Sequence, residues 1–282
     1  MKPTGLHHVR AVLAVPHFAS LPPLIQATLA EVSAATSNMK VISPALIVAA
    51  ADSHFRPLRH ELSAHYIALH PPSGPSGRSR VEANVLGDFE AISVRLNTSC
   101  PDKFLSELQS INHRLTEGRG GWRRGTVRLA DDRAGNQVFF PHVSTVRGQL
   151  ERVRLLIASR SAAPSLFIAA AAYLALLNCH PFTDGNGRTA RVLLNHLMRR
   201  GGLPRHVYIP LHEIALRSHG GYEIAVRLAE IEGDWSPFLK WLIDAIRVCI
   251  VITAEADNEH HLTYQQVRPK APEQIAIDQI SE

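Results

Sequence analysis

The chain has 282 residues, of which 45% are hydrophobic and 20% are charged, so it is long enough to bury a sizeable core in one or two domains. Its net charge is +5, but the lysine and arginine residues are dispersed, which argues against a nucleic-acid-binding surface. The three cysteines are widely spaced, which indicates no disulfide framework and favours a reducing, cytoplasmic compartment.

The N-terminal part of the sequence predicts helices separated by one linker. Residues 1–20 show no regular pattern, and a pair of prolines then leads into a predicted helix at 24–36. Further helical segments are expected at about 43–69 and 81–96. Between them, the stretch HPPSGPSGRSR at 70–80 is typical of a linker, because it combines proline, glycine and serine with no apolar anchor.

We therefore expect three regions: an N-terminal helical region with its linker at 1–80, a main domain at 81–250 and a C-terminal tail at 251–282. We expect no targeting or membrane segment. The apolar run at 11–15 is too short for a signal peptide, and the apolar helix at 165–178 falls short of the roughly 20 residues that a bilayer span requires.

An amphipathic helix at 104–115 and a glycine-arginine loop at 118–125 precede a predicted β-hairpin. Its strands are expected at 126–130 and 137–140, around a turn at 131–136. The densest basic cluster of the chain lies here and consists of Arg119, Arg123, Arg124 and Arg128. We interpret this cluster as a solvated loop near the active site rather than as a nucleic-acid contact.

The most informative stretch is residues 180–191, HPFTDGNGRTAR, between two predicted helices. The helix before it, at 165–178, is apolar on every face and should be buried. The helix after it should begin within the Gly-Asn-Gly-Arg segment and end near Arg199 and Arg200, before two glycines. The free N–H groups at the start of that second helix would face the loop, which suits the binding of phosphate.

The side chains of this loop suggest a catalytic chemistry. His180 has a pKa suited to accepting a proton from an attacking hydroxyl, and Asp184 is a hard oxygen ligand of the kind that Mg²⁺ prefers. Arg188 and Arg191 lie three residues apart, on one face of the helix, where both could meet phosphate oxygens. Cys179, directly before the histidine, is interpreted as a small buried residue rather than as a nucleophile.

This stretch matches the signature of the Fic family, His-Pro-Phe-x-Asp/Glu-Gly-Asn-Gly/Lys-Arg-x-x-Arg, at every fixed position. The resemblance implies an all-α helical bundle with a short β-hairpin flap beside the active site. It also implies transfer of AMP from ATP to a protein hydroxyl. His180 would then be the general base, Asp184 the Mg²⁺ ligand, Arg188 a phosphate clamp and Arg191 the partner of the γ-phosphate. The anion hole would be formed by Gly185, Asn186 and Gly187.

The same resemblance implies that the hairpin binds a target protein and that residues after the motif contact the adenine. The family's flap, here about 126–141, holds a target protein by adding one of its segments as a strand, and Val138 to Phe140 would contribute the exposed edge. Without the resemblance, a plain surface hairpin is equally compatible with the sequence. Near the adenine the family often carries Asn-Arg-x-x-Tyr-Tyr, of which only Tyr222 is retained here.

A departure near the N-terminus bears on regulation. Many members carry an inhibitory helix ending in Ser/Thr-x-x-x-Glu-Gly/Asn, whose glutamate pairs with the last arginine of the motif. Residues 33–38 occupy the expected place, but Ser37 replaces the glutamate. A serine hydroxyl cannot reproduce the carboxylate's bidentate bond, so one hypothesis leaves Arg191 free and the enzyme poorly inhibited. The other is that 33–38 is an ordinary helix end.

The sequence therefore predicts a protein adenylyltransferase that uses Mg²⁺ and ATP on a Ser, Thr or Tyr hydroxyl. Three alternatives remain: use of another nucleotide, removal of AMP from a modified protein, and a non-enzymatic regulator. The glycine at 187 favours AMP transfer over the phosphotransferase branch of the family. The apparent loss of the inhibitory glutamate argues against AMP removal, because that residue can position water. The sequence leaves the target and a homo-oligomer open.

Overall fold

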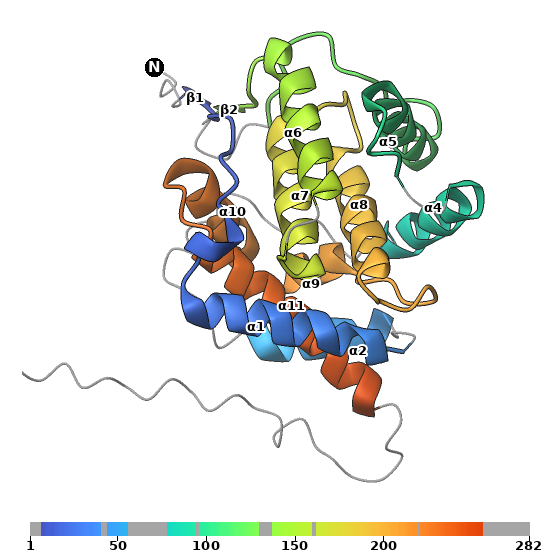
Figure 1. Ribbon diagram of the computed structural model, residues 1–282, viewed down its shortest axis with the longest axis vertical. Coiled ribbons are helices and arrows are strands. Elements are labelled where there is room, and N and C mark those ends of the chain that lie inside the picture. The colour runs from blue at the N-terminus through green and yellow to red at the C-terminus, as the bar shows by residue number, and fades with distance from the viewer. Residues whose placement is uncertain are drawn as a thin grey trace, which may run out of the picture.

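The computed structural model describes residues 7–40, 44–55, 78–93, 96–129, 137–159, 162–218 and 220–255. This part of the chain is almost entirely helical, as expected (Figure 1). Its α-helices are α1 (Pro23–Ala35), α2 (Pro44–Phe55), α4 (Arg78–Ile92), α5 (Pro101–Leu115), α6 (Val146–Ala158), α7 (Ser165–Cys179), α8 (Asn186–Arg200), α9 (Leu211–Arg217), α10 (Gly221–Ile231) and α11 (Ser236–Glu255). Within the described ranges, none of these helices combines the length and apolar character needed to cross a bilayer.

The core is built around the antiparallel pair α7 and α8, which lie side by side in the centre of Figure 1. Helix α7 is buried over most of its length because its alanine and leucine residues cover every face. Its small alanines allow α8 to approach closely. Helix α8 ends at two arginines followed by Gly201, as the sequence predicted. The loop between the two helices is therefore held on a rigid base.

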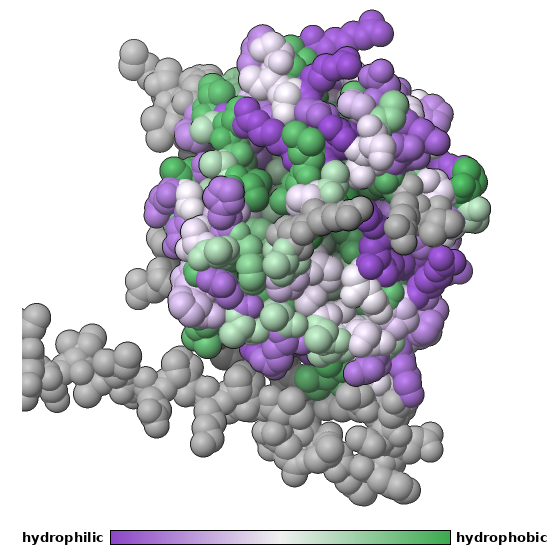
Figure 2. All heavy atoms as spheres, viewed as in Figure 1, coloured by the Kyte–Doolittle hydropathy of each residue, from purple (hydrophilic) through white to green (hydrophobic). Residues whose placement is uncertain are grey.

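The other helices cover this pair on three sides. Helix α6 packs on α7, while α4 and α5 pack on α8. Helices α1, α2 and α11 lie together at the opposite end of the molecule from the two β-strands (Figure 1). Hydrophilic residues gather along the side formed by α4 and α5 (Figure 2), which agrees with the low hydrophobic content of these two helices.

The flap differs from the predicted hairpin in one respect. Val127 and Leu129 face β2 (Gln137–Phe139) in the antiparallel sense expected of a hairpin, through Leu129 N–H to the Val138 carbonyl at 2.9 Å and Phe140 N–H to the Val127 carbonyl at 3.0 Å. The other edge of β2, however, is not exposed. It pairs in parallel with β1 (His7–Val9), in the register His7 to Gln137 and Val9 to Phe139.

Two sequence expectations about the N-terminal half were therefore wrong. Residues 1–20 were expected to be irregular, yet β1 forms because an extended segment can pair with a free strand edge through its backbone alone, without an alternating side-chain pattern. The linker was expected to continue to residue 80, but Arg78 already begins α4. The predicted turn at 131–136, and the parts of the predicted helix and linker at 56–77, lie outside the described residues.

Candidate active site

His180 directly follows α7 and takes a left-handed backbone conformation, with φ of 47°. Its N–H donates to the Leu176 carbonyl at 3.0 Å and so satisfies one of the free carbonyls at the helix end. This conformation is uncommon for a residue with a side chain and turns the chain sharply out of the helix. The rigid core helix therefore fixes the backbone of the predicted general base.

The His180 ring is buried against Phe140, the residue that follows β2. The two rings stack at 3.6 Å between centroids, with 19° between their planes. Burial lowers the pKa of His180 to about 4, and the cations Arg10 and Arg123 act in the same direction. The Leu177 carbonyl and Asp184 oppose the shift. The imidazole is therefore neutral at physiological pH and able to accept a proton.

The turn after His180 requires glycine. Gly185 precedes α8 with φ of 78°, and a Cβ atom there would lie 2.7 Å from Thr116 Cγ2 and 2.8 Å from Asn112 Nδ2. The first bond of α8 runs from the Thr189 N–H to the Gly185 carbonyl at 2.8 Å. The N–H groups of the three residues between them, Asn186, Gly187 and Arg188, therefore have no acceptor within the helix and mark a site for anions.

The side chain of Asn186 braces this loop instead of facing a ligand. Its Oδ1 accepts from the Phe182 N–H and its Nδ2 donates to the Phe182 carbonyl, both at 2.8 Å. Phe182 is fully buried and stacks on Trp122 at 4.6 Å. Only the backbone of Asn186 thus remains for phosphate, while its side chain keeps the loop in shape.

Arg123 was expected in a solvated loop, but it is only 4% exposed. Its guanidinium donates to the carbonyls of Pro141 at 2.5 Å and Cys179 at 3.3 Å, so it ties the flap to the end of α7. The backbone N–H of Arg123 also donates to the Pro181 carbonyl at 2.9 Å. Buried carbonyl oxygens need a hydrogen-bond donor, and the guanidinium supplies one to two of them, which explains why this arginine lies inside the protein.

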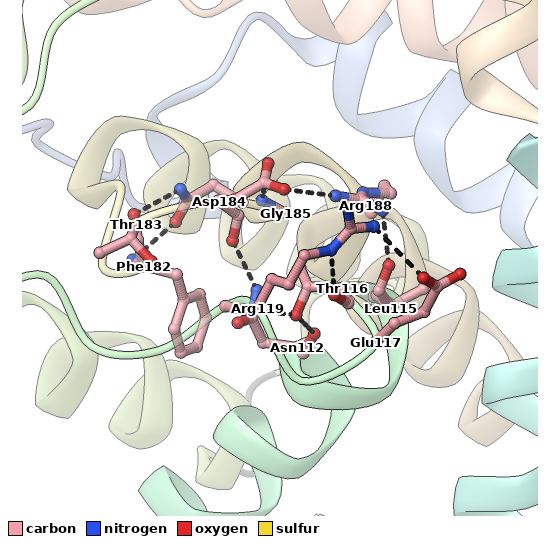
Figure 3. A network of polar contacts seen from close by, with 12 residues as sticks. Asn112, Leu115, Thr116, Glu117, Arg119, Phe182, Thr183, Asp184, Gly185 and Arg188 are labelled. Carbon is pink, nitrogen blue, oxygen red and sulfur yellow. Dashed lines mark hydrogen bonds and ion pairs between the residues drawn. The ribbon is translucent and has the colours of Figure 1, made fainter.

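Asp184 and Arg188 form the exposed edge of the site, above the end of α5 (Figure 3). Asp184 Oδ2 accepts from Arg188 Nη2 at 2.9 Å, and Asp184 Oδ1 accepts from the Gly185 N–H at 2.5 Å. Arg188 Nη1 donates to the Leu115 carbonyl at 2.5 Å. Asp184 is 66% exposed, so its remaining lone pairs are accessible. Both side chains therefore lie beside the anion site at the start of α8.

The chemistry of this edge fits Mg²⁺ bound together with phosphates. Mg²⁺ prefers one or two carboxylates with phosphate and water oxygens over a cage made only of protein ligands. Asp184 supplies one such carboxylate. The described residues contain no group of three or more histidine, cysteine, aspartate or glutamate side chains that would make a protein-only site.

Arg191 is not free, contrary to one of the two sequence hypotheses. Its Nε lies 3.0 Å from Oε2 of Glu82 on α4, and its Nη2 lies 2.5 Å from Oε1. Glu82 is fully buried and also accepts from the Tyr208 hydroxyl at 2.9 Å. Burial alone would lower the pKa of Arg191, but the Glu82 charge outweighs it and raises the pKa. A buried glutamate thus forms an ion pair with the arginine at the end of the motif.

Glu82 escaped the sequence search because its surroundings depart from the inhibitory pattern at two positions. Arg78 stands where the pattern has Ser or Thr, and Ala83 where it has Gly or Asn. The signal that remained was Glu82-Ala83-Asn84 at the start of a helix. Ser37, which was compared with the inhibitory glutamate, is instead exposed beyond the end of α1, where its hydroxyl donates to the Ala34 carbonyl at 2.8 Å.

Tyr222, predicted near the base of the nucleotide, lies in the first turn of α10 (Gly221–Ile231) and is partly buried. Its hydroxyl shares a 2.6 Å hydrogen bond with that of Tyr173 on α7. Burial raises the pKa of Tyr173, and the Arg191 charge acts against that shift, which places both tyrosines in the neighbourhood of Arg191. The next residue, Glu223, was not singled out from the sequence. Its Oε2 is buried without a hydrogen bond, and burial raises its pKa to about 7.

Cys179 packs in the core and is fully buried. Burial raises the pKa of its thiol to about 12, so it is protonated and unreactive at neutral pH. The interpretation of Cys179 as a structural residue is consistent with these observations, and the nucleophile must come from elsewhere.

Comparison with known proteins identifies relatives in one family. The model of the Fic/DOC family matches residues 103–198, from α5 through the flap to α8. The protein adenylyltransferase Fic of Drosophila ananassae is 36% identical over 96 residues, which are 33% of this chain and 18% of that relative. The protein adenylyltransferase fic-1 of Caenorhabditis elegans is 42% identical over 74 residues, which are 26% of this chain and 13% of that relative. The chain thus spans less than a fifth of the length of these relatives.

A structural match extends further along the chain. The crystal structure of a Fic family protein from Desulfovibrio desulfuricans covers 87% of this chain and 78% of its own, with a TM-score of 0.59 and 16% sequence identity. At this identity the match concerns the fold. It includes helices on both sides of the region that the family model covers, so the helices around α7 and α8 share a common arrangement.

Proposed function

The chain is a member of the Fic/DOC family, and on that premise we propose that it is a protein adenylyltransferase. It would transfer AMP from Mg-ATP to a Ser, Thr or Tyr hydroxyl of a target protein. The observation that carries the proposal is the placement of His180. A neutral imidazole, fixed at the end of α7, stands at one end of a loop whose other end is an anion-binding helix start.

The residues have separate tasks in this reaction. The N–H groups at the start of α8 and the guanidinium of Arg188 hold the phosphates. His180 accepts the proton of the target hydroxyl while the hydroxyl oxygen attacks the α-phosphorus. The bond from the α-phosphorus to its bridging oxygen breaks, and pyrophosphate leaves. Asp184 would hold Mg²⁺, whose charge offsets that of the phosphates.

The pairing of Arg191 with Glu82 supports a restrained form of this activity. A γ-phosphate that binds Arg191 must first displace a carboxylate that already makes bidentate contact. The buried ion pair therefore competes directly with ATP. We infer that the native chain transfers AMP slowly and that a change at Glu82 releases it.

A second candidate function, removal of AMP from a modified protein, gains support from Glu82. A carboxylate at the inhibitory position can position a water molecule for attack on the α-phosphorus. The sequence argument against this function rested on the absence of that glutamate. Because Glu82 pairs with Arg191 at the site, hydrolysis of the phosphate–protein bond is the main alternative.

One experiment separates the two candidates. The chain and its Glu82→Gly variant are incubated with Mg²⁺ and ATP, and their intact masses are measured, with His180→Ala in the same background as the control. Gain of one AMP by Glu82→Gly, and no gain by the double variant, supports transfer. No gain with ATP, GTP, UTP or CTP would count against transfer. Release of AMP from modified protein by the native chain would then favour removal.

A further inference from the structure

Three side chains form a layered stack at the catalytic histidine. The His180 ring covers one face of Phe140 at 3.6 Å, and the guanidinium carbon of Arg10 lies 4.5 Å from the centroid of the same ring. One face of a phenyl ring cannot accommodate two planar groups at these distances. The order is therefore Arg10, Phe140, His180, with the guanidinium over the face that the imidazole leaves open.

Arg10 is itself held rigidly. It pairs with Glu230 of α10 at 2.9 Å, and the two side chains are only 9% and 1% exposed. Glu230 also accepts from Asn178 Nδ2 at 3.2 Å. Asn178 in turn bonds the N-terminal segment through the Ala11 carbonyl and the Leu13 N–H, at 3.1 and 3.0 Å. This network joins residues 10–13 to the last turn of α7, two residues before the histidine.

The histidine needs such a support because hydrogen bonds do not orient its ring. A catalytic imidazole is commonly fixed through the nitrogen that does not take part in the reaction. Here Nδ1 is buried with no hydrogen-bond partner. The Leu177 carbonyl is near enough to favour the protonated ring, but it does not reach hydrogen-bonding geometry. The stack on Phe140 is the contact that sets the ring plane.

We propose that Arg10 is a positioning residue for His180: it clamps Phe140 against the imidazole and so holds the general base at a fixed angle. The inference rests on the proposed function. It concerns a residue outside the stretch 103–198 that the family model matches. The N-terminal segment thereby becomes part of the catalytic centre. The alternative is that Arg10 only anchors the N-terminus to α10.

The test compares Arg10→Met, Phe140→Leu and the double variant, all in the Glu82→Gly background, with Arg147→Met as a matched control. Arg147 forms an ion pair with Asp102 in which both side chains are largely exposed. We expect each single variant to lower the rate of AMP transfer at saturating ATP by about tenfold, a part of the 10²–10⁴ that a general base supplies. The KM for ATP should stay within about twofold, because the phosphate loop is unchanged.

The comparison of the rate loss in the double variant with the losses in the two single variants decides the matter. If Arg10 acts through Phe140, the double variant is no slower than the slower single variant. Additive losses, a rate unchanged in Arg10→Met, or a raised KM at constant rate would each overturn the proposal. Phe140→Leu keeps the Arg10–Glu230 pair, so it tests the stack even if Arg10→Met unfolds, which thermal melting would reveal.

A second readout does not depend on activity. The Cε1 proton of His180 experiences the ring current of Phe140, and its NMR signal can be assigned by its loss in His180→Ala. Arg10→Met should move this signal towards the value of an exposed histidine, whereas Arg147→Met should not. An unmoved signal overturns the proposal. If the parent transfers no AMP, the proposed function fails, while the NMR shift still decides whether Arg10 positions the ring.

Discussion

Arg191 and Glu82 lie 109 positions apart in the chain, and their side chains form an ion pair that is buried away from solvent. The arginine belongs to the helix that starts at the phosphate loop, and the glutamate to a helix that packs across it. Two charges removed from water in this way depend on each other, because either one alone would be an uncompensated buried charge. The pair therefore links the folding of α4 to the helix that begins at the candidate site.

Replacement of Glu82 by glycine should both destabilise the chain and activate it. The uncompensated Arg191 should lower the free energy of unfolding by about 3–5 kcal/mol. AMP transfer should rise by about tenfold or more, because displacing even 1.4 kcal/mol of competing interaction corresponds to a factor of ten. ATP should then stabilise the variant more than the native chain. Urea unfolding with and without Mg-ATP, together with intact mass, measures both effects.

The matched control is Glu90→Gly. Glu90 also lies on α4, is mostly buried and pairs with an arginine of α8, Arg199, at 2.7 Å. Glycine costs the same helix about 1 kcal/mol at either position. Glu90→Gly should destabilise the fold without raising AMP transfer. Equal activation by the two variants would mean that loosening of α4, and not the release of Arg191, is responsible.

The helical core could be predicted because its signals are local. The all-round apolar sequence of α7 indicates burial, and the two arginines and glycine that follow α8 mark its end within one or two residues. The strand β1 could not be predicted in this way. It is three residues long, and its pairing with β2 uses backbone groups that any sequence supplies.

Much the same distinction holds for the site. The motif indicated which residues could meet phosphate, and the structure places His180 and Asp184 in the loop before α8 and Arg188 in the first turn of that helix. The partner of Arg191 was a matter of tertiary packing. Glu82 lies on a helix whose sequence departs from the family pattern, while Ser37, which fits the expected position, faces solvent. For this reason Ser37→Glu should leave ATP turnover unchanged.

The pH dependence should reflect the buried state of His180. Transfer requires the neutral imidazole, so activity should persist as the pH falls from 8 to about 5 and then decline through the pKa of about 4. Burial, together with Arg10 and Arg123, depresses this pKa below the unfolded value of about 6.5. The contribution of His180 to the free energy of unfolding is therefore fully present above pH 6.5 and is lost as the pH falls from there towards 4. The acid limb is measured in Glu82→Gly, with circular dichroism at each pH. An acid limb near 6.5 would instead indicate an exposed base.

The strand β1 should restrict access to β2, the edge on which a target segment was expected. His8 pairs with Val138 and its side chain is exposed. His8→Pro should weaken β1 because proline has no backbone N–H group to donate to a neighbouring strand. Loss of one or two hydrogen bonds of about 1 kcal/mol each lowers the equilibrium constant for pairing of β1 with β2 by about five- to thirtyfold.

The measurement is hydrogen exchange of the peptide that contains Gln137–Phe139, followed by mass spectrometry. Exchange should be faster in His8→Pro and unchanged in His8→Ala, which removes the same side chain and keeps the backbone donor. Self-modification in the Glu82→Gly background should rise with the proline if an acceptor segment uses this edge. Equal exchange in the two variants would show that β1 does not protect β2.

Gly185→Ala should damage the phosphate loop itself. An added methyl group would lie within 2.8 Å of both Thr116 and Asn112, at a φ of 78° that costs a non-glycine residue about 1–2 kcal/mol. We expect the free energy of unfolding to fall by about 2–4 kcal/mol and AMP transfer to be lost. Gly148→Ala is the control, because Gly148 lies on the exposed face of α6 with open space around it, and alanine there should stabilise by about 0.5–1 kcal/mol. Urea unfolding of the two variants compares them directly. If Gly185→Ala proves as stable as Gly148→Ala, the turn before α8 tolerates a side chain and the loop is less constrained than its contacts with α5 indicate.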